Sequence, residues 1–295
     1  MIVLSLSEFR NLAGKIASLL EAEHVVFEYK LFPDGESYIR LPVEKVNVEG
    51  QDIVLVQSLY PQQDKRLVEL FFMLDLVKRL GASRVIVVAP YLAYSRQDKE
   101  FRPGENISIL TVLKILEKLG TDIFLTVDIH KEDVLKEVSM KALNVCIYEE
   151  VASFLRGKVL PSETVILGPD KGALGRAKSV ASLLGCEYDY LEKSRDRITG
   201  EIAVKPKELN VADRNVVIVD DIISTGGTIA LAAKSVKELG AKRVIAICTH
   251  GLFVRNAVER MISSGVDEIV TSDSILTPYT KISVAKPVAQ TIKQL

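Results

Sequence analysis

Two separate stretches of the chain repeat one pattern. Residues 81–98 read GASRVIVVAPYLAYSRQD and residues 240–257 read GAKRVIAICTHGLFVRNA, and each stretch follows an amphipathic segment that ends in Leu-Gly. Further on, residues 120–128 (GTDIFLTVD) match residues 265–273 (GVDEIVTSD). A repeat of helix, Leu-Gly-Ala, strand and aromatic-x-Arg is too specific for two unrelated strand and helix units, so we interpret it as a duplication.

Both copies alternate strands with helices. This alternation predicts an α/β fold in which each copy forms a mostly parallel sheet flanked by helices. The 295 residues suffice for two such domains. We place them at 1–156 and 157–295, because Gly157 and Pro161 interrupt the pattern there. Each half ends in a strand and a helix, and the terminal helix, at about 286–294, is a candidate to pack back on the first domain.

The two matches differ in spacing. The first has an offset of 159 residues and the second an offset of 145, so the first copy carries about fourteen extra residues. They fall most simply between Arg96 and Leu110, directly after a strand. Because insertions at the carboxyl end of a sheet usually serve a site, we expect Arg96 and Gln97 to bind a ligand, and an ordinary surface loop is the alternative.

Residues 216–228, VVIVDDIISTGGT, predict a buried strand that ends in Asp220 and Asp221. Hydroxyls and glycines follow, and then a helix from about Ile229. The N–H groups of such a turn suit a phosphate. The two acids would repel a phosphate, so we expect them to accept hydrogen bonds from the vicinal hydroxyls of a sugar. Neither the Walker pattern nor G-x-G-x-x-G is present, and a turn with simple Asp capping is the alternative.

Polar residues also gather at other turns. Phe32 lies beside Asp34 and Glu36 in LFPDGESYIR, where an aromatic face next to acceptors suits an adenine or a ribose, although an ordinary hairpin tip looks the same. Asp128 and His130 follow a strand two residues apart, which predicts that they share a face.

Asp170 follows another strand, in LGPDKGALGR. One imidazole and one carboxylate could hold Mg²⁺ beside substrate phosphates, because Mg²⁺ takes few protein ligands. Lys193, Arg195 and Arg197 alternate in a charged segment, so they lie on one side if it is extended. A flap that carries cations over a phosphate has this pattern, and so does a solvated hairpin tip.

The composition, with 48% hydrophobic and 26% charged residues, is that of a soluble globular protein. The net charge is −1 without a basic block, which argues against a nucleic-acid partner. No apolar run approaches the roughly 18 residues of a membrane span, and the first residues, MIVLSLSEFRNL, do not read as a signal peptide. Three scattered cysteines indicate neither a disulfide framework nor a zinc site. We therefore expect a cytoplasmic protein.

Six motifs, FPDGE, YSRQD, VDIH, GPDKG, EKSRDR and VDDIISTGGT, occur in this order across nearly the whole chain. As an ordered set they resemble the ribose-phosphate pyrophosphokinase family, which has the phosphoribosyltransferase fold. The resemblance implies transfer of the pyrophosphoryl group of ATP to the C1 hydroxyl of ribose 5-phosphate. The products are phosphoribosyl diphosphate (PRPP), for nucleotide biosynthesis, and AMP. It also implies Mg²⁺ and a homo-oligomer, at least a dimer, whose active site is shared between subunits.

The resemblance assigns roles residue by residue. The residues that approach ATP are Phe32, Asp34, Glu36, Arg96, Gln97 and His130; the Mg²⁺-linked pair is His130 and Asp170; the catalytic cations are Lys193 and Arg195; the residues that bind ribose 5-phosphate are Asp220, Asp221, Ser224, Thr225, Gly226, Gly227 and Thr228. Two features depart from the family pattern: Ser224 stands where many members have Asp, and residues 99–106 differ from the usual segment.

Two other functions remain open from the sequence. A type I phosphoribosyltransferase would share VDDIISTGGT but would not need the second copy of the domain. A non-catalytic PRPP-binding regulator could dispense with the cations Lys193 and Arg195 and with the pair His130 and Asp170, all of which are present.

Overall fold

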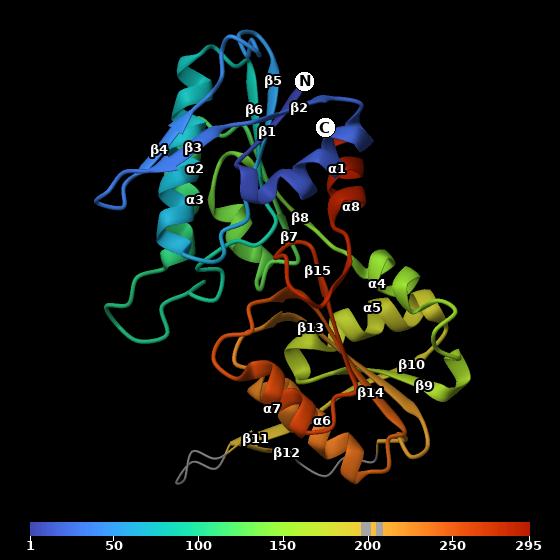
Figure 1. The fold of residues 1–295 in the computed structure, drawn as a ribbon. Helices are drawn as coiled ribbons and strands as arrows, with labels where there is room; N and C mark the ends of the chain where they lie inside the picture. The colour runs from blue at the N-terminus through green and yellow to red at the C-terminus, as the bar shows by residue number, and fades with distance from the viewer. Residues whose placement is uncertain (196–201, 205–208) are drawn as a thin grey trace. The chain divides into compact units, whose positions relative to one another are not determined.

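The computed structural model describes the backbone of residues 1–195, 202–204 and 209–295, and the side chains of 1–192 and 209–295. The chain divides into two compact units, which can be followed by colour in Figure 1. The first unit comprises Met1–Cys146 together with Ser283–Leu295, and the second comprises Ile147–Ile282. By comparison, the boundary expected from the sequence lies after residue 156.

The first unit is built on a parallel sheet of six strands in the order β2-β1-β5-β6-β7-β8. Its strands are β1 (Ile2–Ser5), β2 (Glu23–Val26), β5 (Asp52–Val56), β6 (Arg84–Ala89), β7 (Ile123–Val127) and β8 (Lys141–Val145). Its helices are α1 (Arg10–Leu20), α2 (Gln63–Arg79), α3 (Ser108–Lys118) and α8 (Ala285–Lys293). The β5, β6 and β7 strands are almost continuously apolar and buried, as expected for the centre of a parallel sheet covered on both faces.

The second unit has a parallel sheet with the corresponding order, β10-β9-β13-β14-β15-β16. Its strands are β9 (Thr164–Gly168), β10 (Glu187–Tyr190), β13 (Asn215–Ile223), β14 (Arg243–Gly251), β15 (Glu268–Ser272) and β16 (Thr280–Ile282). Its helices are α4 (Tyr148–Leu155), α5 (Leu174–Leu184), α6 (Gly227–Glu238) and α7 (Ala257–Ser263). The predicted fold class, two duplicated mostly parallel α/β domains, is therefore confirmed.

Each unit also carries a small antiparallel hairpin at the same place in its topology, after the second strand. In the first unit the hairpin is β3 (Glu28–Leu31) with β4 (Ser37–Arg40). In the second unit it is β11 (Lys193–Arg195) with β12 (Ile202–Val204). The two segments that the sequence singled out as a tip and a flap are thus topological equivalents.

Individual interactions repeat as well. Lys78 in α2 pairs with Asp122 (Nζ to Oδ2, 3.3 Å), and Lys237 in α6 pairs with Asp267 (2.8 Å). In both units the carboxylate also accepts a 2.7 Å hydrogen bond from a backbone N–H of the preceding strand in the sequence. The same bonds therefore join helix, sheet and turn in both copies.

The extra residues of the first copy divide between a loop and a helix. The α3 helix begins 12 residues after Arg96, whereas α7 begins two residues after Arg255. The α3 helix has 11 residues and α7 has seven. Ten extra residues therefore lie in the loop before α3, and four lengthen the helix itself.

The α8 helix returns the chain to the first unit, where it packs on α1. Its face of Val288, Ala289 and Ile292 is buried, while Lys286 and Gln290 are exposed. Within the described part of the chain, no helix is long and apolar enough to cross a membrane.

Candidate active site

The turn after β13 has the geometry of an anion cradle. Asp220 and Asp221 lie within the carboxyl end of β13, and the α6 helix begins at Gly227. The helix starts two residues earlier than expected, because Gly226 takes the left-handed conformation (φ 71°) and serves as its N-cap. Ser224 is half-buried, and Thr225 and Thr228 are exposed, so hydroxyls and the first N–H groups of α6 meet at one place.

Helix α7 braces this turn. A Cβ atom on Gly226 would lie 2.8 Å from the carbonyl oxygen of Ala257, so only glycine fits. Arg260 Nη1 donates a 3.0 Å hydrogen bond to the carbonyl oxygen of Thr225. The turn is therefore positioned by tertiary contacts as well as by its own sequence.

The two neighbouring aspartates create a strongly negative electrostatic potential at the end of β13. Burial and the neighbouring Asp221 carboxylate raise the pKa of Asp220 well above its ordinary value, and the Arg176 guanidinium acts in the opposite direction. The backbone N–H of Ile222 donates to Asp221 Oδ1 at 2.7 Å. Asp220 also faces Cys248 on β14, and burial raises the pKa of that thiol. A partner with hydroxyl donors would stabilise this pair of carboxylates.

Arg176 is a further candidate for the site, and the sequence analysis does not single it out. It lies in α5, with its guanidinium 5.5 Å from the centre of the Tyr148 ring, and its charge partly offsets the rise in the pKa of Asp220. The signal in the sequence is a basic residue in the first turn of the helix that follows the GPDKG motif.

Asp170 belongs to the same edge of the second sheet. It follows β9, which pairs in parallel with β13, so both strands present their carboxyl ends at one edge. The N–H of Gly172 donates to Asp170 Oδ1 at 3.0 Å, which caps the short helical turn Lys171–Ala173. The structure thus brings Asp170 and the cradle to one edge of one sheet.

In the first unit, Asp128 and His130 follow β7, but they do not share a strand face. The strand ends at Val127, and Asp128 has a left-handed φ of 42°. Asp128 is buried while His130 is exposed. The expected alternation fails because it requires extended backbone through both residues.

Arg96 and Gln97 lie in the loop that follows β6. Arg96 is exposed. The Gln97 side-chain amide donates to Glu105 Oε2 (3.4 Å), and the same oxygen accepts from the N–H groups of Phe101 (3.0 Å) and Arg102 (3.2 Å). Glu105 therefore organises the extra loop of the first copy and orients Gln97 within it.

Phe32, Asp34 and Glu36 form the exposed tip of the β3–β4 hairpin. The tip is closed by a bond from Phe32 N–H to the Glu36 carbonyl (2.8 Å), and Asp34 Oδ1 accepts from Glu36 N–H at 3.1 Å. The Phe32 ring meets Tyr38 edge to face, with centroids 5.9 Å apart.

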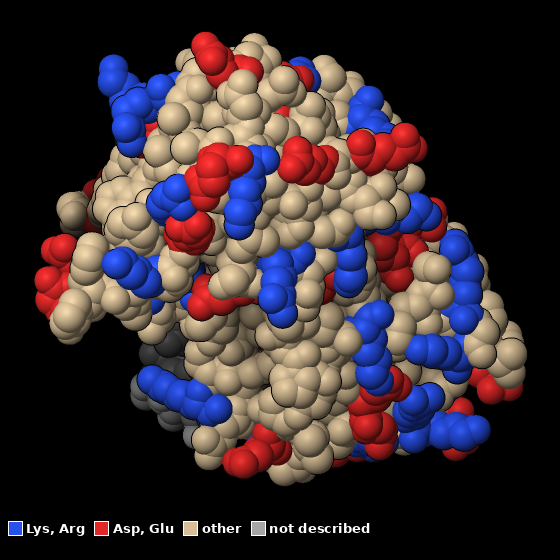
Figure 2. Space-filling view, turned by 45° about the horizontal axis from the view of Figure 1, so that its top comes forward, with Lys and Arg blue, Asp and Glu red and all other residues tan. Residues whose placement is uncertain are grey.

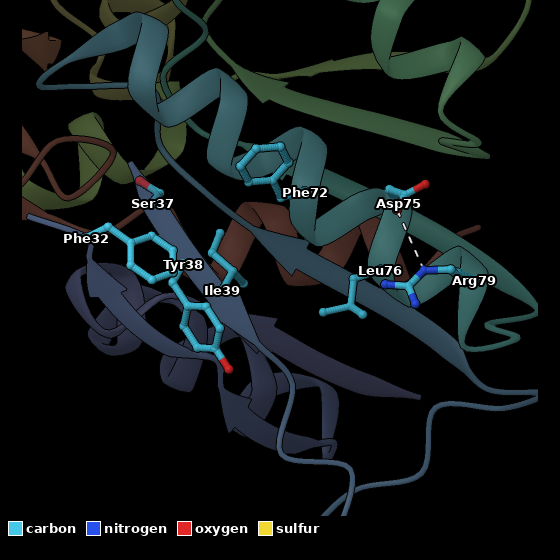
Figure 3. A pocket seen from close by; sticks show the side chains of 8 residues that line it. All are labelled: Phe32, Ser37, Tyr38, Ile39, Phe72, Asp75, Leu76 and Arg79. Atoms are coloured by element: carbon cyan, nitrogen blue, oxygen red, sulfur yellow. Dashed lines mark ion pairs between the residues drawn. The ribbon is translucent and has the colours of Figure 1, made fainter. Parts of the chain in front are cut away.

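A surface pocket of about 290 Å³ lies between this hairpin and α2 (Figure 3). The hairpin contributes Phe32, Ser37, Tyr38 and Ile39, and α2 contributes Phe72, Asp75, Leu76 and Arg79. The lining combines aromatic and aliphatic side chains with polar groups, and Phe32 and Phe72 are both exposed.

Lys193 and Arg195 lie on β11, whose backbone pairs with β12. Their side chains, and Arg197, lie outside the described residues. Among the side chains that the structure does describe, no group of three or more His, Cys, Asp or Glu residues could hold a metal ion. On the face shown in Figure 2, basic and acidic side chains are interspersed, so an anionic substrate depends on local groups such as those above.

Comparison with known proteins gives consistent matches over the whole chain. The N-terminal domain of ribose phosphate pyrophosphokinase matches residues 1–120, and the phosphoribosyl transferase domain matches residues 144–280. A ribose-phosphate pyrophosphokinase of Methanopyrus kandleri is 42% identical, covering 100% of this chain and 99% of its own. A ribose-phosphate pyrophosphokinase of Sulfolobus acidocaldarius is 43% identical, covering 92% of this chain and 91% of its own. The crystal structure of phosphoribosylpyrophosphate synthetase from Mycobacterium smegmatis superposes with a TM-score of 0.87 at 27% identity, covering 99% of this chain and 97% of that one.

Proposed function

The chain belongs to the ribose-phosphate pyrophosphokinase family, and from this premise we propose that it transfers the pyrophosphoryl group of ATP to the C1 hydroxyl of ribose 5-phosphate. PRPP, for nucleotide biosynthesis, and AMP are the products. The observation that carries the proposal is the cradle at 220–228, where two carboxylates and a helix N-terminus stand side by side. Few ligands other than a sugar phosphate would satisfy both groups at once.

In this proposal the acids and the turn divide the sugar phosphate between them. Asp220 and Asp221 accept hydrogen bonds from the 2- and 3-hydroxyls of ribose. The 5-phosphate binds the N–H groups and hydroxyls of Ser224, Thr225, Gly226, Gly227 and Thr228, at the positive end of α6. The C1 hydroxyl is thereby left to react.

ATP is bound by residues of the first unit. Arg96, Gln97 and His130 contact the adenine and the phosphates, and the tip residues Phe32, Asp34 and Glu36 approach the nucleotide from a neighbouring subunit. The supporting observation is that the tip is exposed, with an aromatic ring beside two carboxylates. The protein is accordingly a homo-oligomer, and the apolar surface of Leu31, Phe32 and Phe72 is available for contact between subunits.

His130 and Asp170 fit a Mg²⁺ ion in their donor chemistry. Asp170 offers a carboxylate at a strand end, beside a turn that already orients it through Gly172. Mg²⁺ keeps several waters and takes few protein ligands, so one carboxylate and one imidazole, acting directly or through a water, suffice beside ATP phosphates. Bound there, Mg²⁺ would neutralise phosphate charge.

The reaction is a displacement at the β-phosphorus of ATP. The oxygen of the C1 hydroxyl forms a bond to that phosphorus, and the bond between the β-phosphorus and the oxygen bridging to the α-phosphorus breaks. AMP leaves with the bridging oxygen and its electron pair, and the hydroxyl proton passes to solvent. Such transfer requires alignment and charge stabilisation more than covalent help, which is the role of Lys193 and Arg195.

The test is an assay of the purified protein with ATP, ribose 5-phosphate and Mg²⁺. We expect AMP and PRPP to form in equal amounts. Consumption of PRPP with a free base, without AMP release, would instead identify a type I phosphoribosyltransferase. Since ATP and ribose 5-phosphate are both available in the cytoplasm, we place the enzyme there.

A further inference from the structure

The β3–β4 hairpin depends on contacts outside itself for its orientation. In the described part of the chain, its two strands pair with each other and with no other strand. An isolated two-stranded hairpin is marginally stable in water. The direction of its tip is therefore set by the contacts between the hairpin and the rest of the first unit.

One of these contacts is a buried carboxylate on α2. The Glu69 side chain is 0% exposed. Its Oε2 accepts a 2.8 Å bond from Arg66 Nη1, and its Oε1 accepts a 2.9 Å bond from the hydroxyl of Ser37 on β4. Lys65 Nζ lies 3.9 Å from the same Oε1. Because a buried carboxylate is costly unless it is paired and hydrogen-bonded, these donors stabilise Glu69 together.

Arg66 holds Glu69 from the core side. Its side chain is 6% exposed, and Nη1 also pairs with Glu8 Oε2 at 2.5 Å. The guanidinium lies 5.5 Å from the centre of the Phe9 ring. Burial alone would lower the pKa of Arg66, but the hydrogen bonds to Glu8 and Glu69 raise it, so the cation stays charged. The position of Glu69 is thus fixed independently of the hairpin.

Ser37 lies at the root of the tip. Leu31 and Ser37 form the last pair of the β3–β4 ladder before residues 32–36. The surface pocket between the hairpin and α2 reaches this end of the hairpin, where Phe32 and Ser37 line it (Figure 3). The bond from Ser37 to Glu69 therefore joins the root of the tip to α2 beside this pocket.

We propose that Glu69 is a positioning residue, whose buried carboxylate fixes the hairpin tip through Ser37 and so presents Phe32, Asp34 and Glu36 to the nucleotide. The proposal rests on the proposed function, in which the tip approaches ATP. It assigns a functional role to a residue that lies outside the tip and outside every motif of the sequence.

The test compares three variants of the full chain with the wild type. Ser37→Ala removes the hydroxyl, Ser37→Thr retains it, and Ser83→Ala removes an exposed serine from the turn between α2 and β6 as a matched control. Amide hydrogen exchange of residues 28–40 is measured without substrates, together with kcat and KM for each substrate. Glu69→Gln is a second probe, and its thermal midpoint checks that it folds.

For Ser37→Ala we expect faster exchange at residues 31–37 and a KM for ATP raised about tenfold, the effect of one bond to a charged acceptor. The KM for ribose 5-phosphate should stay within about twofold, since the cradle lies in the other unit. Ser37→Thr should restore both properties, and Ser83→Ala should match the wild type.

Unchanged exchange in folded Ser37→Ala and Glu69→Gln would overturn the positioning role of Glu69. Faster exchange with an unchanged KM for ATP would uphold the contact but refute the placement of the tip at the nucleotide. The two failures are therefore distinguishable.

Discussion

Gly226 carries the tightest backbone constraint in the cradle. Its φ of 71° is strained for any other residue, and an added Cβ would lie 2.8 Å from the carbonyl oxygen of Ala257. We expect Gly226→Ala to destabilise the protein by about 1–3 kcal/mol and to raise the KM for ribose 5-phosphate, because the turn must move away from α7. Thermal unfolding and steady-state kinetics measure the two effects.

Gly175 offers a matched control for this substitution. It lies in the first turn of α5, and an added Cβ would meet no atom within 4 Å. Gly175→Ala should therefore be neutral, or stabilising by about 0.4–1 kcal/mol through the unfolded state. Equal effects of the two substitutions would mean that the turn tolerates a side chain at Gly226.

Asp220 should make stability depend on pH. Burial and Asp221 raise its pKa in the folded protein above the ordinary value of 3.8, so folding favours the protonated acid. The ionised Asp220 carboxylate therefore destabilises the fold at neutral pH. The free energy of unfolding should rise as the pH falls from the pKa of Asp220 in the folded protein toward its lower pKa in the unfolded chain. Asp220→Asn should raise the thermal midpoint at neutral pH, with a gain that shrinks toward acid pH.

The same substitution should weaken binding of ribose 5-phosphate about tenfold or more, because a charged acceptor of a sugar hydroxyl is lost. Calorimetric titration of ribose 5-phosphate checks this. If the variant gained stability and lost no affinity for ribose 5-phosphate, Asp220 would not be a binding residue, although the raised pKa of its carboxyl would be supported.

The two hairpins occupy the same place in the topology, and the sequence comparison did not reveal this. The strands of the first hairpin, β3 and β4, are exposed or half-buried, so a buried core does not constrain their side chains. The β6 and β14 strands are buried in both units, and there the duplication is readable from the sequence. The equivalence of the two copies was thus predictable from the sequence at the buried strands, where packing constrains the side chains. It was not predictable at the hairpins.

The β11–β12 hairpin is proposed to act on the reaction rather than on binding. Lys193→Ala should lower kcat by on the order of 10³, since a cation delivered to a phosphoryl transition state contributes that much, with a smaller rise in KM. Lys234→Ala, on the exposed face of α6, is a control for loss of one positive charge. Normal kcat with weakened ATP binding would assign Lys193 to ground-state binding instead.

Much of the candidate site was predictable because motifs at strand ends point to one edge of a sheet. Asp170, Asp220 and Asp221 were predicted to follow strands or to end them, and the structure places them at one edge of the second sheet. Arg176 and Glu69 were not, because a single charged residue within a helix usually faces solvent. Only the tertiary structure shows that one lies near Asp220 and that the other is fully buried.

At the scale of the whole molecule, the first unit is completed by α8. Ile292 is buried on this helix, which packs on α1. Ile292→Ala should cost about 2–5 kcal/mol of stability, the usual range for such a truncation in a core. Gln290→Ala, on the exposed side of α8, should cost almost nothing, and calorimetry of both variants makes the comparison. Equal unfolding temperatures would show that α8 contributes little to the unit.

The path of the chain between the units has a consequence for synthesis on the ribosome. Residues 283–295 belong to the first unit, yet they are translated after the entire second unit. Domains generally fold as they emerge from the ribosome. The face of α1 that α8 covers nevertheless stays exposed while the intervening 136 residues, from Ile147 to Ile282, are synthesised. The unit whose translation begins first is therefore completed second, and nascent chains that stop before residue 283 would present that apolar face to chaperones or to one another.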